Sequence, residues 1–138
     1  MSYSFPLEPG KVREFAVATQ VGHGRSAEVG TVIPPTFLAA RVFWKPADQP
    51  AVIGDRMDRT RVLHAGEEFR FHGRVPAAGE VLTVTERLGD EWRKEGRRGG
   101  GLHFMTVVTE FRDADGVLVA EAISTAVETE RAAEEGAR

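Results

Sequence analysis

The sequence predicts one α+β domain in which helices lie on one face of an antiparallel sheet. Apolar side chains follow helical spacing before about residue 60, whereas two-residue alternation and a β-rich composition take over after it. A chain of 138 residues with 41% hydrophobic content is long enough to bury the core of one domain. We therefore expect a single domain over residues 1–138, with a charged tail from about residue 129.

The first helix is predicted to begin near Pro9 and to end before Gly22. Positions i, i+3, i+4 and i+7 of this segment are Val12, Phe15, Ala16 and Thr19. This spacing places the larger apolar groups on one stripe of a helix, which can then pack against the rest of the domain.

A second helix is predicted from Pro34 to Trp44, within VIPPTFLAARVFWKP. The Pro-Pro pair suits a helix start, where amide donors are not needed, and Pro46 suits the end. Only Thr36 and Arg41 are polar between these limits. A helix that is apolar nearly all round is expected to be buried.

Long strands are predicted in residues 62–75, 80–96, 99–116 and 117–129. The link Asp113-Ala114-Asp115-Gly116 indicates an antiparallel hairpin, because Asp and Gly accept the positive φ values of tight turns. The sheet must bury one face, and the helix from Pro34 to Trp44 is the most apolar cover available. We therefore predict the hot-dog arrangement, a curled antiparallel sheet wrapped around one helix; a ferredoxin-like or cystatin-like domain would use similar elements.

Composition excludes several classes of function. The net charge of -3 and the pI near 5.8 give no basic field of the kind that attracts nucleic acid or anionic membranes. The absence of cysteine excludes disulfides, thiolate nucleophiles and Cys-based metal sites. The start of the sequence lacks the pattern of a secretory signal, and no segment approaches the length of a membrane span. We expect a cytoplasmic protein with no nucleic-acid or membrane partner, no metal and no cofactor.

Four pieces of sequence, in their order along the chain, resemble the MaoC-like hot-dog dehydratases. These pieces are KVREFAVAT, IPPTFLAA, LHAGEEFRFHGRVPAAGEVLTVTERL and GGGLHFMTVVTEFRDADGVLVAEAISTAV. More narrowly, they are similar to the N-terminal-type, FAS1-like dehydratase branch, and the match runs from about Phe5 to Thr129. The resemblance implies an (R)-specific hydratase or dehydratase acting on 3-hydroxyacyl or 2-enoyl thioesters of coenzyme A or acyl carrier protein.

In catalytic members of this family, a loop motif Asp-x-Asn-Pro-x-His supplies a histidine base and an acid partner. If His23 takes the place of that histidine, the acid position is Ala18, and Gln20 and Val21 stand at the Asn and Pro positions. Because the acid is missing, the chain could instead be the non-catalytic half of a paired dehydratase. Alternatively, Glu28 would have to fold back to replace it.

Further site residues are predicted from sequence patterns that are less specific than this motif. His64 is a second candidate catalytic residue, and Thr36 and Phe37 offer amides that the resemblance places near the thioester carbonyl. A basic run at a hairpin tip is a candidate contact for coenzyme A phosphates or an acidic carrier protein. Its members are Arg93, Lys94, Arg97 and Arg98.

Other polar residues have mainly structural interpretations. His72 and His103 are expected to be half-exposed strand residues, and one of Glu67 and Glu68 could face the covered side of the sheet or a subunit interface. The link over residues 45–61 could be a lid or a surface loop. Its Asp55 and Asp58 could supply the absent acid.

Dimerisation is expected, as a homodimer or as a heterodimer with a second hot-dog subunit, because pairing covers the open edge of the sheet. A hot-dog thioesterase is a weaker alternative, since PPTFLAARVFW offers no carboxylate to activate water. A non-enzymatic dimer that binds acyl thioesters is the remaining alternative.

Overall fold

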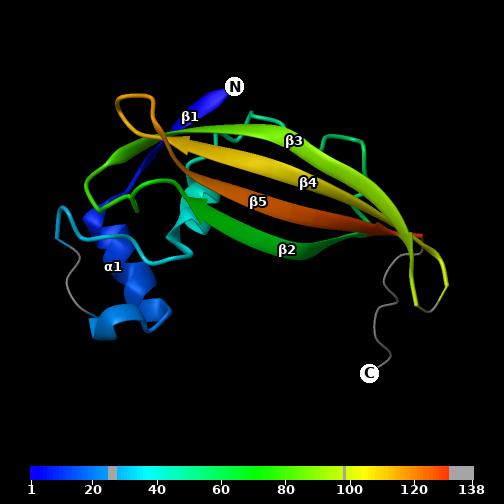
Figure 1. The fold of residues 1–138 in the computed structure, drawn as a ribbon, viewed down its shortest axis with the longest axis horizontal. Helices are drawn as coiled ribbons and strands as arrows, with labels where there is room; N and C mark the ends of the chain where they lie inside the picture. Colours follow the sequence, from blue (N-terminus) through cyan, green and yellow to red (C-terminus); the bar gives the residue numbers. More distant parts are fainter. Residues whose placement is uncertain (25–27, 98, 131–138) are drawn as a thin grey trace. The chain divides into compact units, whose positions relative to one another are not determined.

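The computed structural model describes residues 1–24, 28–97 and 99–130, without the side chain of residue 23. The strands are β1 (Ser2–Pro6), β2 (Val62–Phe71), β3 (Val81–Glu95), β4 (Gly101–Arg112) and β5 (Leu118–Thr129). They form one five-stranded sheet in the order β1-β3-β4-β5-β2 (Figure 1). The α+β class, the antiparallel sheet of the predicted hot-dog fold and the four long strands are confirmed.

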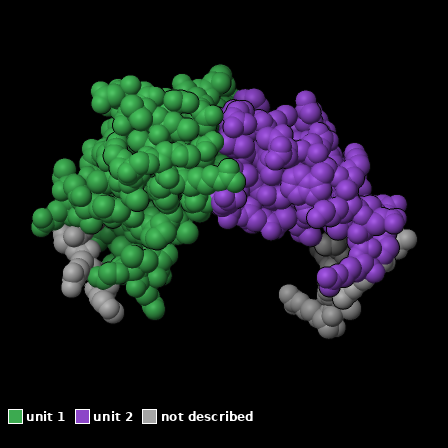
Figure 2. All heavy atoms as spheres, in the orientation of Figure 1, with its two compact units in different colours: residues 1–49, 69–85, 109–122 green, residues 50–68, 86–108, 123–138 purple. Residues whose placement is uncertain are grey.

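The chain forms two compact units (Figure 2). Unit 1 contains residues 1–49, 69–85 and 109–122, and unit 2 contains residues 50–68, 86–108 and 123–138. Strands β2 to β5 each contribute residues to both units. The contacts described below lie within one unit or the other.

Strand β1 was not predicted. It pairs antiparallel with β3, with Phe5 opposite Leu82 and Tyr3 opposite Val84. Tyr3 and Phe5 are buried, whereas the serines that flank them are exposed. This is the two-residue alternation of a strand with one covered face. The signal was therefore present in SYSFP, but it is only five residues long.

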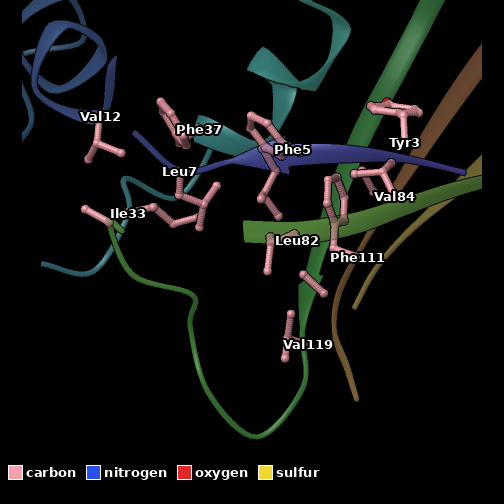
Figure 3. Packing of buried hydrophobic residues seen from close by; sticks show 14 residues of the cluster. Tyr3, Phe5, Leu7, Val12, Ile33, Phe37, Leu82, Val84, Phe111 and Val119 are labelled. Carbon is pink, nitrogen blue, oxygen red and sulfur yellow. The ribbon is translucent and has the colours of Figure 1, made fainter. Parts of the chain in front are cut away.

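The core of unit 1 is an apolar cluster that joins β1, β3, β4 and β5 to the helical segments (Figure 3). Phe5 lies at its centre and has no exposed surface. Its ring centroid lies 5.9 Å from that of Phe37, 5.1 Å from that of Trp44 and 6.3 Å from that of Phe111. These separations are those of favourable aromatic pairs, so burial and ring packing both stabilise this cluster.

Helix α1 (Pro9–Ala18) forms as predicted, with Pro9 in its first turn and Val12 buried. The amide of Thr19 donates to the carbonyl of Phe15 at the C-terminal end. Gln20 follows with a φ of 59°, the left-handed conformation that commonly ends a helix. Among the described residues, no helix combines the length and the apolar composition needed to cross a bilayer.

The prediction of a fully buried helix from Pro34 to Trp44 was wrong. The segment forms η2, a 3₁₀ helix over Phe37–Phe43. Phe37 and Leu38 are buried, but Val42 is 59% exposed and Phe43 is 84% exposed. A 3₁₀ helix stacks residues three apart, so only one narrow side of it can contact the core. The apolar composition fitted a buried helix, yet unit 1 covers only one side.

Arg74 links the turn that precedes β3 to the turn that follows β4. Its guanidinium donates two hydrogen bonds of 2.8 Å to Glu80 and one of 3.0 Å to Asp113. Glu80 also accepts a hydrogen bond from the amide of Ala77 within the turn that leads into β3. Hydrogen bonds from Arg74 are the largest cause that lowers the pKa of both carboxyl groups.

The predicted hairpin between β4 and β5 is confirmed. The amide of Asp113 donates to the carbonyl of Val117, and the carboxylate of Asp113 accepts hydrogen bonds from the amides of Asp115 and Val117. Gly116 has a φ of 78°, a conformation that costs other residues more. The DADG sequence thus fixes the turn through both an Asp cap and a glycine.

We expect Phe5→Ala to destabilise the protein by roughly 3–5 kcal/mol, because it leaves a cavity among three aromatic rings. Urea unfolding followed by circular dichroism measures the change. Phe43→Ala is the matched control, since it removes the same side chain from an exposed position. Equal effects of the two substitutions would contradict the packing described here.

The Arg74 network predicts a specific pH dependence. Because the pKa values of Glu80 and Asp113 are lowered in the folded state, both groups stabilise it above their ordinary pKa values. That contribution is lost as the pH falls through the lowered folded-state pKa values, below about pH 4. Thermal unfolding at pH 7 and pH 3 should show a larger drop in Tm for the wild type than for Arg74→Gln. Arg59→Gln, at an exposed position, should keep the wild-type drop; an identical drop in Arg74→Gln would refute the linkage.

Candidate functional site

An apolar groove lies between α1 and η2 in unit 1, and we call it the α1–η2 groove. Its volume is about 510 Å³, within the range of sites that bind small organic ligands. The lining residues are Lys11, Glu14, Phe15 and Ala18 from α1, and Phe37, Ala40, Phe43 and Trp44 from η2 and its C-terminal end.

The two walls of the groove are held together by aromatic packing. The rings of Phe15 and Phe37 meet edge to face, with centroids 5.4 Å apart. Phe37 is buried in the core around Phe5, so the position of η2 follows from the core of unit 1. The polar side chains of the lining are Lys11 and Glu14, which form an exposed ion pair of 3.0 Å. An apolar chain of a ligand would therefore find a preformed surface here.

The chain leads from this groove into the loop with the predicted catalytic histidine. Ala18, which was predicted to stand at the acid position if His23 is the family histidine, lines the groove and is the last residue of α1. His23 follows in η1, a 3₁₀ turn over Val21–Gly24, and its side chain lies outside the described residues. Glu28 is exposed, and its amide donates to the hydroxyl of Thr31. The role of His23 stays a prediction.

The predicted amide donors lie at the start of η2. Thr36 is the N-cap of this 3₁₀ helix and its side chain makes no capping hydrogen bond. The amide of Phe37 donates to the carbonyl of Pro34 at 3.0 Å. This amide already has an acceptor, so binding a thioester oxygen would require the turn to open.

The predicted phosphate contacts lie on the β3–β4 hairpin in unit 2. Arg93 and Lys94 are exposed near the end of β3, and Lys94 places its ammonium 6.0 Å from the ring centroid of Phe104. Arg97 is exposed in the turn, and Arg98 lies outside the described residues. A role for these cations stays a prediction.

A charged cluster around His103 was missed by sequence reasoning. His103 was expected to be half exposed, but it is only 7% exposed. Its Nε2 lies 2.7 Å from Glu91 and its Nδ1 lies 3.5 Å from Glu128. Both carboxylates belong to strands that flank β4, and the alternation in GLHFMTVV did reveal which residues share a face. The sequence could not show that the covered face carries acidic partners.

This cluster lines a second hollow of about 540 Å³ in unit 2, which we call the His103 hollow. Its charged lining residues are Arg61, Arg93, Glu95, His103, Glu128 and Glu130. Arg61 donates hydrogen bonds to Asp58 and Glu128 and to two backbone carbonyls. Carboxylates outnumber guanidinium groups in this lining, so its charge does not favour an anionic ligand.

The remaining predicted polar residues are placed as follows. His64 is exposed on β2 in unit 2. His72 is exposed and lies 2.9 Å from Glu121 in unit 1. Glu67 accepts a hydrogen bond from Ser124. Asp58 accepts hydrogen bonds from Thr60, which are the first cause that lowers its pKa, and it also binds Arg61.

Among the described residues, no group of three or more His, Asp or Glu side chains could hold a metal ion. The polar groups of the α1–η2 groove are an ammonium and a carboxylate already paired with each other. The groove can therefore hold an apolar ligand, and its lining offers no acid or base beyond this pair.

Comparison with known families gives one match. The family described as the FAS1-like dehydratase domain region matches residues 2–122. Among curated proteins, none matches this sequence.

Solved structures share the fold at low sequence identity. The ChsH1-ChsH2 complex from Mycobacterium tuberculosis is 16% identical with a TM-score of 0.64, and the match covers 98% of this chain and 86% of that one. The HadBC (3R)-hydroxyacyl-ACP dehydratase complex from the same organism is 20% identical with a TM-score of 0.56, covering 92% and 94%. The (R)-hydratase from A. caviae is 13% identical with a TM-score of 0.54, covering 91% of each chain.

We expect His103→Gln to destabilise the protein by roughly 1–3 kcal/mol, because it removes a buried ring that contacts both Glu91 and Glu128. Urea unfolding measures the loss. His72→Gln is the control, since that histidine is exposed and faces a single carboxylate. A larger loss for His72→Gln than for His103→Gln would contradict the assignment of His103 as the buried partner.

Proposed function

We propose that this chain, which belongs to the family of the FAS1-like dehydratase domain region, is a hydro-lyase subunit that binds 3-hydroxyacyl or 2-enoyl thioesters. The observation that carries the proposal is the place of Ala18. With His23 as the family histidine, this residue would stand at the acid position of the motif, and it lines an apolar groove of about 510 Å³. An acid at this position would therefore face the groove that suits an acyl chain.

The proposed division of roles follows from the residues around the groove. Phe15, Phe37 and Trp44 hold the apolar part of the acyl chain and exclude water from it. His23 is the proposed base, five residues after Ala18 along the chain. Because an acid partner is missing from the motif, we propose that a second hot-dog subunit supplies it, in a homodimer or a heterodimer.

Paired assembly has support from the fold. Phe43 and Val42 are large apolar residues with more than half of their surface exposed, at the lip of the groove or beside it. Apolar surface of this kind commonly marks an interface. Two of the similar structures are complexes of two different chains. A cytoplasmic location remains part of the proposal.

The first test is binding and hydration of 2-octenoyl-CoA by the purified chain, with His23→Ala beside it. Binding without turnover supports a subunit that needs a partner. Turnover that His23→Ala abolishes supports catalysis by this chain with an acid from elsewhere. Neither binding nor turnover, alone or with a second hot-dog subunit, would overturn the proposal.

The groove predicts a specific effect of filling it. Ala18→Phe should weaken binding of 2-octenoyl-CoA by about tenfold or more, because the ring takes up space that the acyl chain needs. Ala39→Phe is the matched control, since Ala39 is exposed on η2 outside the groove lining. Isothermal titration calorimetry measures both affinities. Unchanged affinity in Ala18→Phe would show that the acyl chain binds elsewhere.

A further inference from the structure

A third hollow is lined by residues of α1 alone. It has a volume of about 460 Å³ and is lined by Gly10, Arg13, Glu14, Val17 and Ala18. Glu14 and Ala18 line both this hollow and the α1–η2 groove. Glu14 and Ala18 are one helical turn apart, so the two spaces adjoin along the side of α1 that carries these residues. We call the space beside Arg13 the Arg13 hollow.

The charged residues within α1, which are Lys11, Arg13 and Glu14, sum to one positive charge. Glu14 is neutralised by Lys11 at 3.0 Å, and Arg13 adds a further positive charge. Within the described residues, the guanidinium of Arg13 has no hydrogen-bond or ion-pair partner. No acidic residue lies in the first turn of α1. An exposed guanidinium with free donors beside an apolar groove suits a ligand with an apolar end and an anionic end.

Of the two residues that line both spaces, Ala18 is the small one. We infer that an extended chain can pass from one space to the other over its methyl group. A thioester with its acyl chain in the groove would then have its carrier arm in the Arg13 hollow. This arrangement also brings the thioester itself to Ala18, at the residue where the family motif has its acid.

We propose that Arg13 binds the phosphate of the phosphopantetheine arm that carries the thioester. This inference rests on the proposed function and adds the group that recognises the carrier. Arg13 is thereby proposed as the phosphate contact in place of the basic residues on the β3–β4 hairpin. Among these, Arg93 lines the His103 hollow, where carboxylates outnumber guanidinium groups. A phosphate would meet attraction at Arg13 and net repulsion in the His103 hollow.

The experiment compares three thioesters of the same acyl group with and without phosphate. Calorimetry gives the affinities of 2-octenoyl-pantetheine, 2-octenoyl-phosphopantetheine and 2-octenoyl-CoA for wild type, Arg13→Gln, Arg93→Gln and Arg59→Gln. Arg59 is an exposed arginine outside all three hollows, so its variant controls for a lost surface charge. Circular dichroism checks that each variant is folded.

The wild type should bind the phosphorylated arm about tenfold more tightly than pantetheine, as one charge-assisted contact would give. Arg13→Gln should remove most of this preference for the phosphorylated arm, whereas Arg59→Gln should keep it. Equal wild-type affinities for phosphopantetheine and coenzyme A thioesters would support the inference with a carrier-protein arm as the source. Tighter binding of the coenzyme A thioester would support it with coenzyme A as the source.

Two results would overturn the inference, and they differ from each other. If Arg13→Gln keeps the phosphate preference, the Arg13 assignment is wrong while the proposed function stands, and loss of the preference in Arg93→Gln would then identify the hairpin. If the wild type binds none of the three thioesters, the proposed function fails and the inference fails with it.

Discussion

The packing of Phe5 is the interaction on which the rest of unit 1 depends. Its ring joins the edge strand β1 to Phe111 of β4 and to Phe37 and Trp44 at the two ends of η2. A seven-residue 3₁₀ helix has little stability of its own, so its position must come from such contacts. The position of the α1–η2 groove depends on the same contacts, because Phe37 and Trp44 also line it.

Helix α1 combines two properties that are often separated in small proteins. Val12 is buried in the core and Phe15 contacts Phe37, so one side of the helix anchors it. The opposite side carries Arg13, Glu14 and Val17 at exposed positions, where side chains are available to a ligand. Ten residues are enough for both tasks because the stripes that face core and solvent are separated around the helix axis.

The sequence predicted the parts of the fold that have a strong local period. The long strands, α1 and the DADG hairpin were predicted because alternation, helical spacing and turn residues all act within a few positions. Strand β1 was missed because its alternation spans only Tyr3 and Phe5. The burial of η2 was overestimated because composition cannot show how much cover a single chain provides.

The site was predictable to a smaller extent, for a physical reason. Ala18 and the loop that follows it could be found from the motif, but the groove forms between α1 and η2, whose contact depends on Phe15 and Phe37 meeting across the fold. In the same way, the charges around His103 come from three different strands. Side chains brought together by folding leave no spacing signal in the sequence.

The α1–η2 groove does not depend on an acidic side chain at position 18. The groove is supported by aromatic packing in the core, and none of its apolar walls depends on the identity of the residue at position 18. An acidic side chain there would add a charge that must be desolvated beside an apolar surface, which costs free energy unless a substrate or a partner compensates. Alanine removes that cost and leaves the groove open. Alanine at position 18 is therefore compatible with the proposed division of roles, in which this chain supplies the acyl groove and His23 and a paired subunit supplies the acid.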